Sequence, residues 1–156
     1  MRPVHYADLS GREGWMPRKK SKIDVLQNVW LFSACTSKEL GRIASLVDEA
    51  EVPAGAVLTK EGASGREFFA VADGKATAKI RGRKIASYGP GDIFGEMSLL
   101  DQGPRSATIT ADTPMQLYVL DGRSFASLID KHPAVARKIL RVMAGRLRKA
   151  EKAPTH

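Results

Sequence analysis

Residues 91–108 read GDIFGEMSLLDQGPRSAT and lie between two stretches with the alternation typical of β-strands. Gly95 has no Cβ, so the backbone there can turn tightly and approach a ligand closely. Residues 97–101 suit one short helical turn, whose free N–H groups and positive dipole end favour a phosphate. Arg105 follows after the stiff Gly103-Pro104 pair, and its planar guanidinium can bond two phosphate oxygens. Ser106 offers a further donor, so the segment is suited to holding one phosphate.

Glu96 lies in the same segment and would be poorly placed beside a bare phosphate. A carboxylate, however, accepts well from a ribose hydroxyl. In isolation, Arg105 would be interpreted as a surface salt-bridge partner of Glu96. The ordered string around the two residues instead favours a ligand that carries both a phosphate and a sugar, which is a nucleotide.

Short alternating runs extend on both sides of this segment. Residues 75–80 alternate strictly, with Ala76, Ala78 and Ile80 on one face, and residues 107–111 repeat the period. Arg81-Gly82 supplies a sharp turn between two such runs. The pattern predicts about eight short strands that form an antiparallel roll.

Helical patterns precede and follow the strands. Thr36 and Glu39 have the spacing by which two side chains satisfy free amides at a helix start, and Asp121 can cap a helix that contains Phe125 and Leu128. A last helix is expected from about Pro133 to Ala150. The layout predicts an α+β domain: N-terminal helices, a β-roll containing a short phosphate-binding helix, and two C-terminal helices. We expect a basic, flexible arm at residues 1–20, the domain at 21–150 and a tail at 151–156.

Composition and charge limit the function classes. The chain has 156 residues and a net charge of +8, but residues 23–130 contain eleven Lys and Arg against fourteen acids. The basic charge therefore lies at the two ends of the chain, and the central body is mildly acidic. No apolar run is long enough to span a membrane, and the first ten residues do not form a secretory signal, so we expect a cytoplasmic protein. Cys35 is the only cysteine and is expected to be a buried apolar residue, with no metal site.

The whole string in residues 91–108 resembles the phosphate-binding cassette of the cyclic-nucleotide-binding domain family, which runs Phe-Gly-Glu, two small or apolar residues, Leu, a spacer and Pro-Arg-x-Ala. The likeness extends over residues 23–150 and implies that Glu96 binds the ribose 2′-hydroxyl and Arg105 the cyclic phosphate. Backbone or side-chain contacts are implied for Gly95, Met97, Ser98, Ser106 and Ala107. Serine at position 106 resembles receptors that favour cAMP, with cGMP as the competing ligand.

In the same family the last helix closes over the base, and Arg146 looks like the lid arginine of bacterial channel-type domains. Met143 and Leu147 could cover the base instead, and Arg146 could equally be one more solvated charge. The family implies a sensor that acts through movement of this helix on a separate effector. The chain is expected as a monomer, or as a homodimer through the same helix, with no cofactor besides the ligand.

Two other function classes compete with a ligand-binding domain. Nucleic-acid binding through the basic ends is the main alternative, and it would require affinity that falls steeply with salt. For an enzyme, the sequence offers no set of catalytic residues, because His5, His132 and His156 share no recognisable motif with a nucleophile. We therefore expect no catalytic residue.

Overall fold

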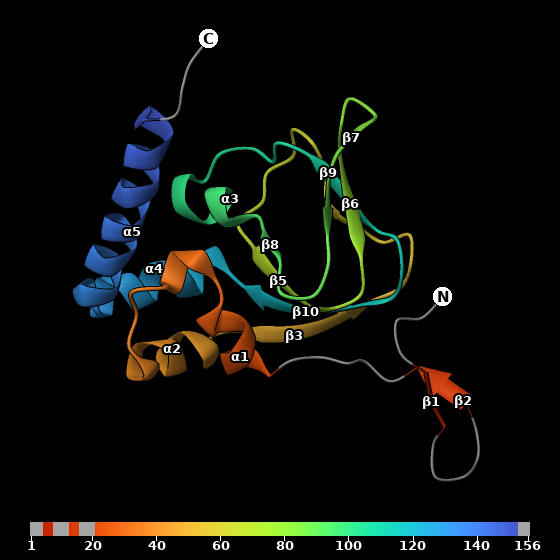
Figure 1. Cartoon of the computed structure of the whole chain (residues 1–156), viewed down its shortest axis with the longest axis horizontal. Helices are drawn as coiled ribbons and strands as arrows, with labels where there is room; N and C mark the ends of the chain where they lie inside the picture. The colour runs from red at the N-terminus through yellow and green to blue at the C-terminus, as the bar shows by residue number, and fades with distance from the viewer. Residues whose placement is uncertain (1–4, 8–12, 16–20, 153–156) are drawn as a thin grey trace.

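Eight antiparallel strands form the centre of the protein in the computed structural model, which describes residues 5–7, 13–15 and 21–152. One four-stranded sheet has the order β3-β10-β5-β8 and the other the order β4-β9-β6-β7 (Figure 1). The α+β class and the eight-stranded roll are confirmed. The strands span Asp48–Val52 (β3), Val57–Thr59 (β4), Phe68–Asp73 (β5), Ala76–Ile80 (β6), Arg83–Tyr88 (β7), Ile93–Phe94 (β8), Thr108–Ala111 (β9) and Met115–Leu120 (β10).

The alternation seen in the sequence matches the burial of the strands. Ala76 and Ala78 of β6 are fully buried. Lys79, which follows Ala78 on the opposite face of the strand, is exposed. β5 is buried along its whole length because β10 and β8 flank it on either side. Such a strand reads as one continuous apolar run rather than as an alternating one.

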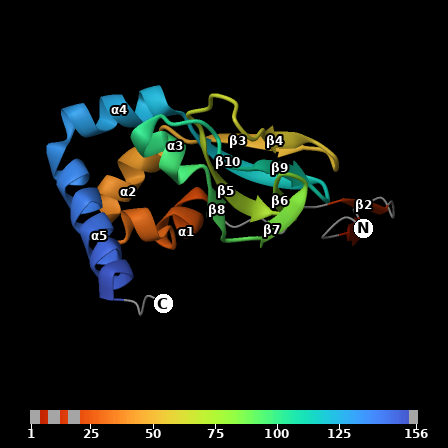
Figure 2. The same cartoon turned by 90° about the horizontal axis from the view of Figure 1, so that it is seen from above.

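The helices gather at one end of the roll (Figures 1 and 2). Two of them precede the roll in the sequence: α1 (Lys22–Gln27) and α2 (Ser37–Ala44), with a 3₁₀ turn η1 (Trp30–Phe32) between them. The others are α3 (Glu96–Asp101), α4 (Gly122–Lys131) and α5 (Pro133–Lys152). The last helix continues two residues beyond its expected end at about Ala150.

The predicted helix starts differ in their outcome. Thr36 and Glu39 form the expected reciprocal cap, in which Glu39 Nα donates to Thr36 Oγ1 at 3.2 Å and Thr36 N donates to Glu39 Oε1 at 2.8 Å. Asp121 occupies the N-cap of α4, but its side chain makes no capping hydrogen bond. Glu39 Oε1 also accepts from Lys138 Nζ at 2.5 Å, which ties the first half of α5 to α2.

The N-terminal arm contains two short strands that the sequence pattern did not predict. His5–Ala7 (β1) pairs antiparallel with Glu13–Trp15 (β2). The basic Arg18, Lys19 and Lys20 lie outside the described residues. Within the described ranges, no helix is both long and apolar enough to cross a membrane.

Candidate functional site

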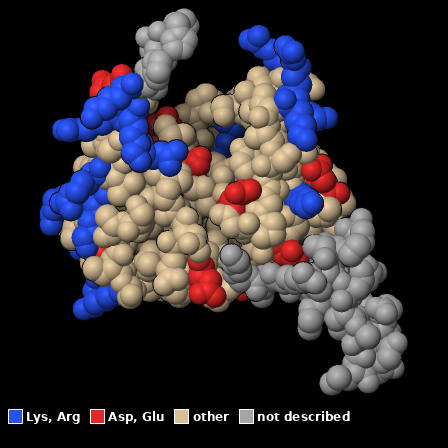
Figure 3. Space-filling model, viewed as in Figure 1, with Lys and Arg blue, Asp and Glu red and all other residues tan. Residues whose placement is uncertain are grey.

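A cavity of about 290 Å³ lies between α3, the segment that follows it and the inner face of the roll. Figure 3 shows the surface hollowed there, with basic atoms inside the hollow. The cavity brings together all seven residues predicted from the cassette: Gly95, Glu96, Met97, Ser98, Arg105, Ser106 and Ala107. Its other walls come from the strands and the adjoining turns, namely Thr59, Ile85, Tyr88, Phe94, Asp101, Pro104 and Ile109.

Gly95 starts α3 with a left-handed backbone, φ 83° and ψ 3°. A Cβ on this residue would lie 2.6 Å from the carbonyl oxygen of Glu67 and 2.8 Å from Nη1 of Arg105. Both distances are shorter than Cβ atoms tolerate. Glycine is thus needed twice here, for the backbone angle and for the approach of the guanidinium.

Arg105 is 6% exposed, which is unusual for a charged side chain. Nη2 donates to the backbone oxygen of Glu67 at 2.9 Å and approaches Glu67 Oε1 at 3.3 Å. Burial lowers the pKa of the guanidinium, and the Glu67 carboxylate opposes that change. Nη1 is buried and has no hydrogen-bond partner among the described residues. A cation held in this way at a cavity wall, with one donor unused, is suited to an anionic ligand.

Glu96 follows Gly95 at the first turn of α3 and is partly buried. Burial raises the pKa of its carboxyl group, and the charge of Arg146 acts in the opposite direction. Burial together with Glu96 and Asp92 raises the pKa of the Tyr88 hydroxyl. Glu96 therefore lies where the cavity wall meets α5.

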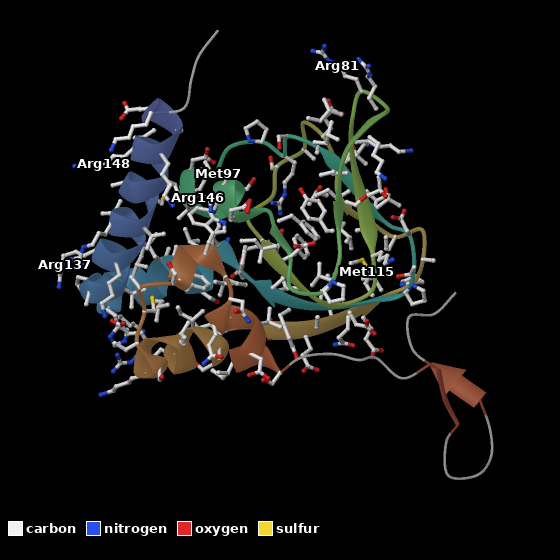
Figure 4. All side chains as sticks on the ribbon, in the orientation of Figure 1. Arg81, Met97, Met115, Arg137, Arg146 and Arg148 are labelled. Atoms are coloured by element: carbon white, nitrogen blue, oxygen red, sulfur yellow. The ribbon has the colours of Figure 1, made fainter. Side chains whose placement is uncertain are left out.

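The three predicted lid residues line a second hollow that adjoins the first. Met143, Arg146 and Leu147 from α5 share it with Glu96 and Met97. Arg146 points from α5 toward Met97 and the body of the protein (Figure 4). Its Cζ atom lies 3.9 Å from the centre of the Trp30 ring, a stacking contact on η1. Arg146 nevertheless belongs to the exposed residues of α5, and Leu147 is 62% exposed.

Sequence reasoning missed three residues that shape the site. Glu67 accepts hydrogen bonds from Arg105, and Trp30 stacks against Arg146. Gly65 lies so close to the guanidinium of Arg105 that a Cβ there would collide with it. Each contact joins parts of the chain far apart in sequence. Gly65 was the one detectable signal, as a glycine in the loop that precedes a buried strand.

Comparison with known proteins gives consistent matches. The family model described as "Cyclic nucleotide-binding domain" matches residues 49–132. The Cyclic AMP receptor protein of Thermus thermophilus is 34% identical over 126 residues, covering 78% of this chain and 58% of that protein.

Among solved structures, the N-terminal domain of a transcriptional regulator from Streptomyces coelicolor A3(2) aligns with a TM-score of 0.76 at 34% identity, covering 82% of this chain and 93% of that one. The regulatory domain of Toxoplasma gondii PKA with cAMP aligns with a TM-score of 0.65 at 31% identity, covering 69% and 42%. The chain spans between 28% and 58% of the length of the curated relatives it matches.

Proposed function

Because the chain belongs to the cyclic nucleotide-binding domain family, we propose that it is a receptor for cAMP whose ligand occupies the cavity beside α3. The observation that carries this proposal is Arg105, which lines the cavity and whose buried Nη1 has no hydrogen-bond partner among the described residues. A cyclic phosphate carries a single negative charge. One guanidinium donor together with the free amides at the start of α3 matches it in charge and in direction.

The proposed pose places the ribose between the phosphate and Glu96. The Glu96 carboxylate accepts from the 2′-hydroxyl, so this acid contacts the sugar and Arg105 the phosphate. AMP carries one more negative charge at neutral pH and has no ring constraint. The extra negative charge on its phosphate would be repelled by the Glu96 carboxylate, so AMP should bind more weakly than cAMP.

Ser106 and the β7 wall are the residues proposed to face the base. Ser106 lines the cavity directly after Arg105, and Ile85 and Tyr88 of β7 form the opposite side. An adenine has no exocyclic 2-amino group for a hydroxyl to bind, so preference for cAMP rests on packing along this wall. The named relatives that refer to cAMP support this choice over cGMP.

Movement of α5 is the proposed output. Met143, Arg146 and Leu147 share a hollow with Glu96 and Met97, so an occupied cavity would change what α5 can contact. A ligand that binds better when α5 is packed against the cavity shifts the population toward that state. A separate protein that recognises α5 in one position would sense the ligand.

Isothermal titration calorimetry with cAMP, cGMP and AMP tests the proposal. We expect saturable binding of cAMP to one site per chain, weaker binding of cGMP and little of AMP. Substituting Arg105 by glutamine should abolish measurable binding while the circular dichroism spectrum stays unchanged. Equal affinity for cAMP and AMP would contradict the proposal, because the cavity would then not recognise the cyclic phosphate.

A further inference from the structure

A further hollow of about 450 Å³ lies between α2 and α4, on the helical side of the protein. The two helices are in contact (Figure 2). None of the residues that line this groove also lines the nucleotide cavity. The α2–α4 groove is lined by Arg42, Ser45, Leu46, Arg123, Ser124, Ser127, Leu128, Lys131 and His132.

The groove is built from one face of α4. Residues 123, 124, 127, 128 and 131 recur at the spacing that keeps them on one side of a helix. Leu128 is buried and, with Leu46, provides an apolar floor, while Ser124 and Ser127 lie between the two cations of the same face. Arg42 faces them from α2. The groove therefore combines hydroxyl donors with charges on both helices.

Its charge is of one sign. Arg42, Arg123 and Lys131 line the groove, and the described residues that line it include neither Asp nor Glu. No ion pair with another described residue involves any of these three cations, whereas Arg105 pairs with Glu67 and Lys138 with Glu39. Three like charges around one hollow repel one another, and an anion placed between them would remove that repulsion.

We propose that the α2–α4 groove binds a small phosphate-bearing anion of the diphosphate or phosphate monoester class. Arg123 and Lys131 each lie four residues from Ser127, so their long side chains can converge at its level on the helix. Arg42 completes the set from α2. Ser45 Oγ donates to the Arg42 carbonyl oxygen at 2.6 Å, so the hydroxyls that donate to the anion are those of Ser124 and Ser127. This inference does not depend on the proposed binding of cAMP.

Backbone amide NMR of the full chain with inorganic pyrophosphate tests the groove. Saturable shifts should appear at Arg123, Ser124 and Ser127 and leave residues 95–107 unmoved. Ser127→Ala, which changes no charge, and Arg123→Gln should each weaken binding about tenfold, the loss expected for one hydrogen bond to a charged group. The matched control is Arg137→Gln, which removes the same charge from an exposed position on α5 that points away from the body (Figure 4).

Each outcome decides the matter. Shifts confined to residues 95–107 would overturn the proposal, because pyrophosphate would then occupy the nucleotide cavity. An equal loss in Arg123→Gln and Arg137→Gln, or no loss in Ser127→Ala, would also overturn it by reducing the effect to net charge. Absence of shifts at millimolar pyrophosphate would do the same.

The same chemistry occurs on lipid headgroups. Sedimentation with vesicles of phosphatidylcholine, with and without phosphatidic acid, distinguishes the two sources. If pyrophosphate competes the protein off the phosphatidic acid vesicles and Ser127→Ala weakens their binding, the groove accepts the headgroup. If the vesicles fail to bind while pyrophosphate does, the groove takes the free anion, and both results support a phosphate site.

Discussion

Glutamine substitutions at Arg105 and Glu67 should have very different effects on cAMP affinity, although the two side chains touch. Arg105→Gln removes the buried guanidinium that we propose holds the cyclic phosphate. A hydrogen bond to a charged group contributes about 1.5–3 kcal/mol. The two hydrogens of Nη1 can give two such bonds to the phosphate, or about 4 kcal/mol, which is roughly a thousandfold in affinity.

Glu67→Gln removes much less. The carboxylate contact with Nη2 is long, at 3.3 Å, and the Glu67 side chain is 49% exposed, so its contribution is about 0.2–1 kcal/mol. The shorter bond of 2.9 Å goes to the backbone oxygen of residue 67, which every substitution retains. We therefore expect Glu67→Gln to weaken cAMP binding by less than about fivefold.

Calorimetric titration of both variants against cAMP measures the difference, with Glu51→Gln as the control. Glu51 is an exposed carboxylate on β3 that does not line the cavity. Similar losses in Glu67→Gln and Arg105→Gln would refute the reasoning. The carboxylate, and not the backbone oxygen, would then be what orients the guanidinium.

Three further outcomes are expected. Gly95→Ala should destabilise the protein by about 1–3 kcal/mol in urea unfolding, because its Cβ would collide with the Glu67 oxygen at a left-handed φ; unchanged stability would exclude that collision. Arg146→Gln should weaken cAMP binding several-fold in calorimetric titration, because the stack on Trp30 at 3.9 Å would no longer hold a cation beside the cavity; unchanged affinity would exclude Arg146 from closing the cavity. Lys138 lowers the pKa of Glu39 below its ordinary 4.5, so the stability that Glu39 contributes over Glu39→Gln should be complete above pH 4.5 and shrink as the pH falls below it. A difference in melting temperature that stayed constant between pH 7 and pH 3 would argue against the pair.

Local patterns predicted most of the elements. The Thr36 and Glu39 cap, the alternation in residues 76–80 and the glycine at position 95 each act within a few residues, so the sequence carries them directly. The strands β1 and β2 were missed because three residues each are too short to show a period. The side chain of Asp121 has a capping residue's position without its hydrogen bond, which spacing alone cannot reveal.

The sequence motif predicted the residues that line the cavity. It did not predict the residues that hold Arg105 and Arg146 in place. Residues 95–98 and 104–107 line the cavity together because they flank the short helix α3 and its following turn in one continuous segment. Glu67 and Gly65 meet Arg105 from a loop 38 and 40 residues earlier, and Trp30 meets Arg146 across more than a hundred residues. Such contacts depend on the sheet order, which a strand pattern without pairing information leaves open.

The helix α5 is anchored to the rest of the protein mainly through its first half. Its root is fixed by the buried Val135 and Ile139 and by the Lys138 link to α2, while exposed residues predominate from Leu140 onward. The later part of the helix contacts η1 through the stack of Arg146 on Trp30 at 3.9 Å. The proposed movement of α5 would therefore be smallest near Val135 and Ile139 and largest toward Lys152.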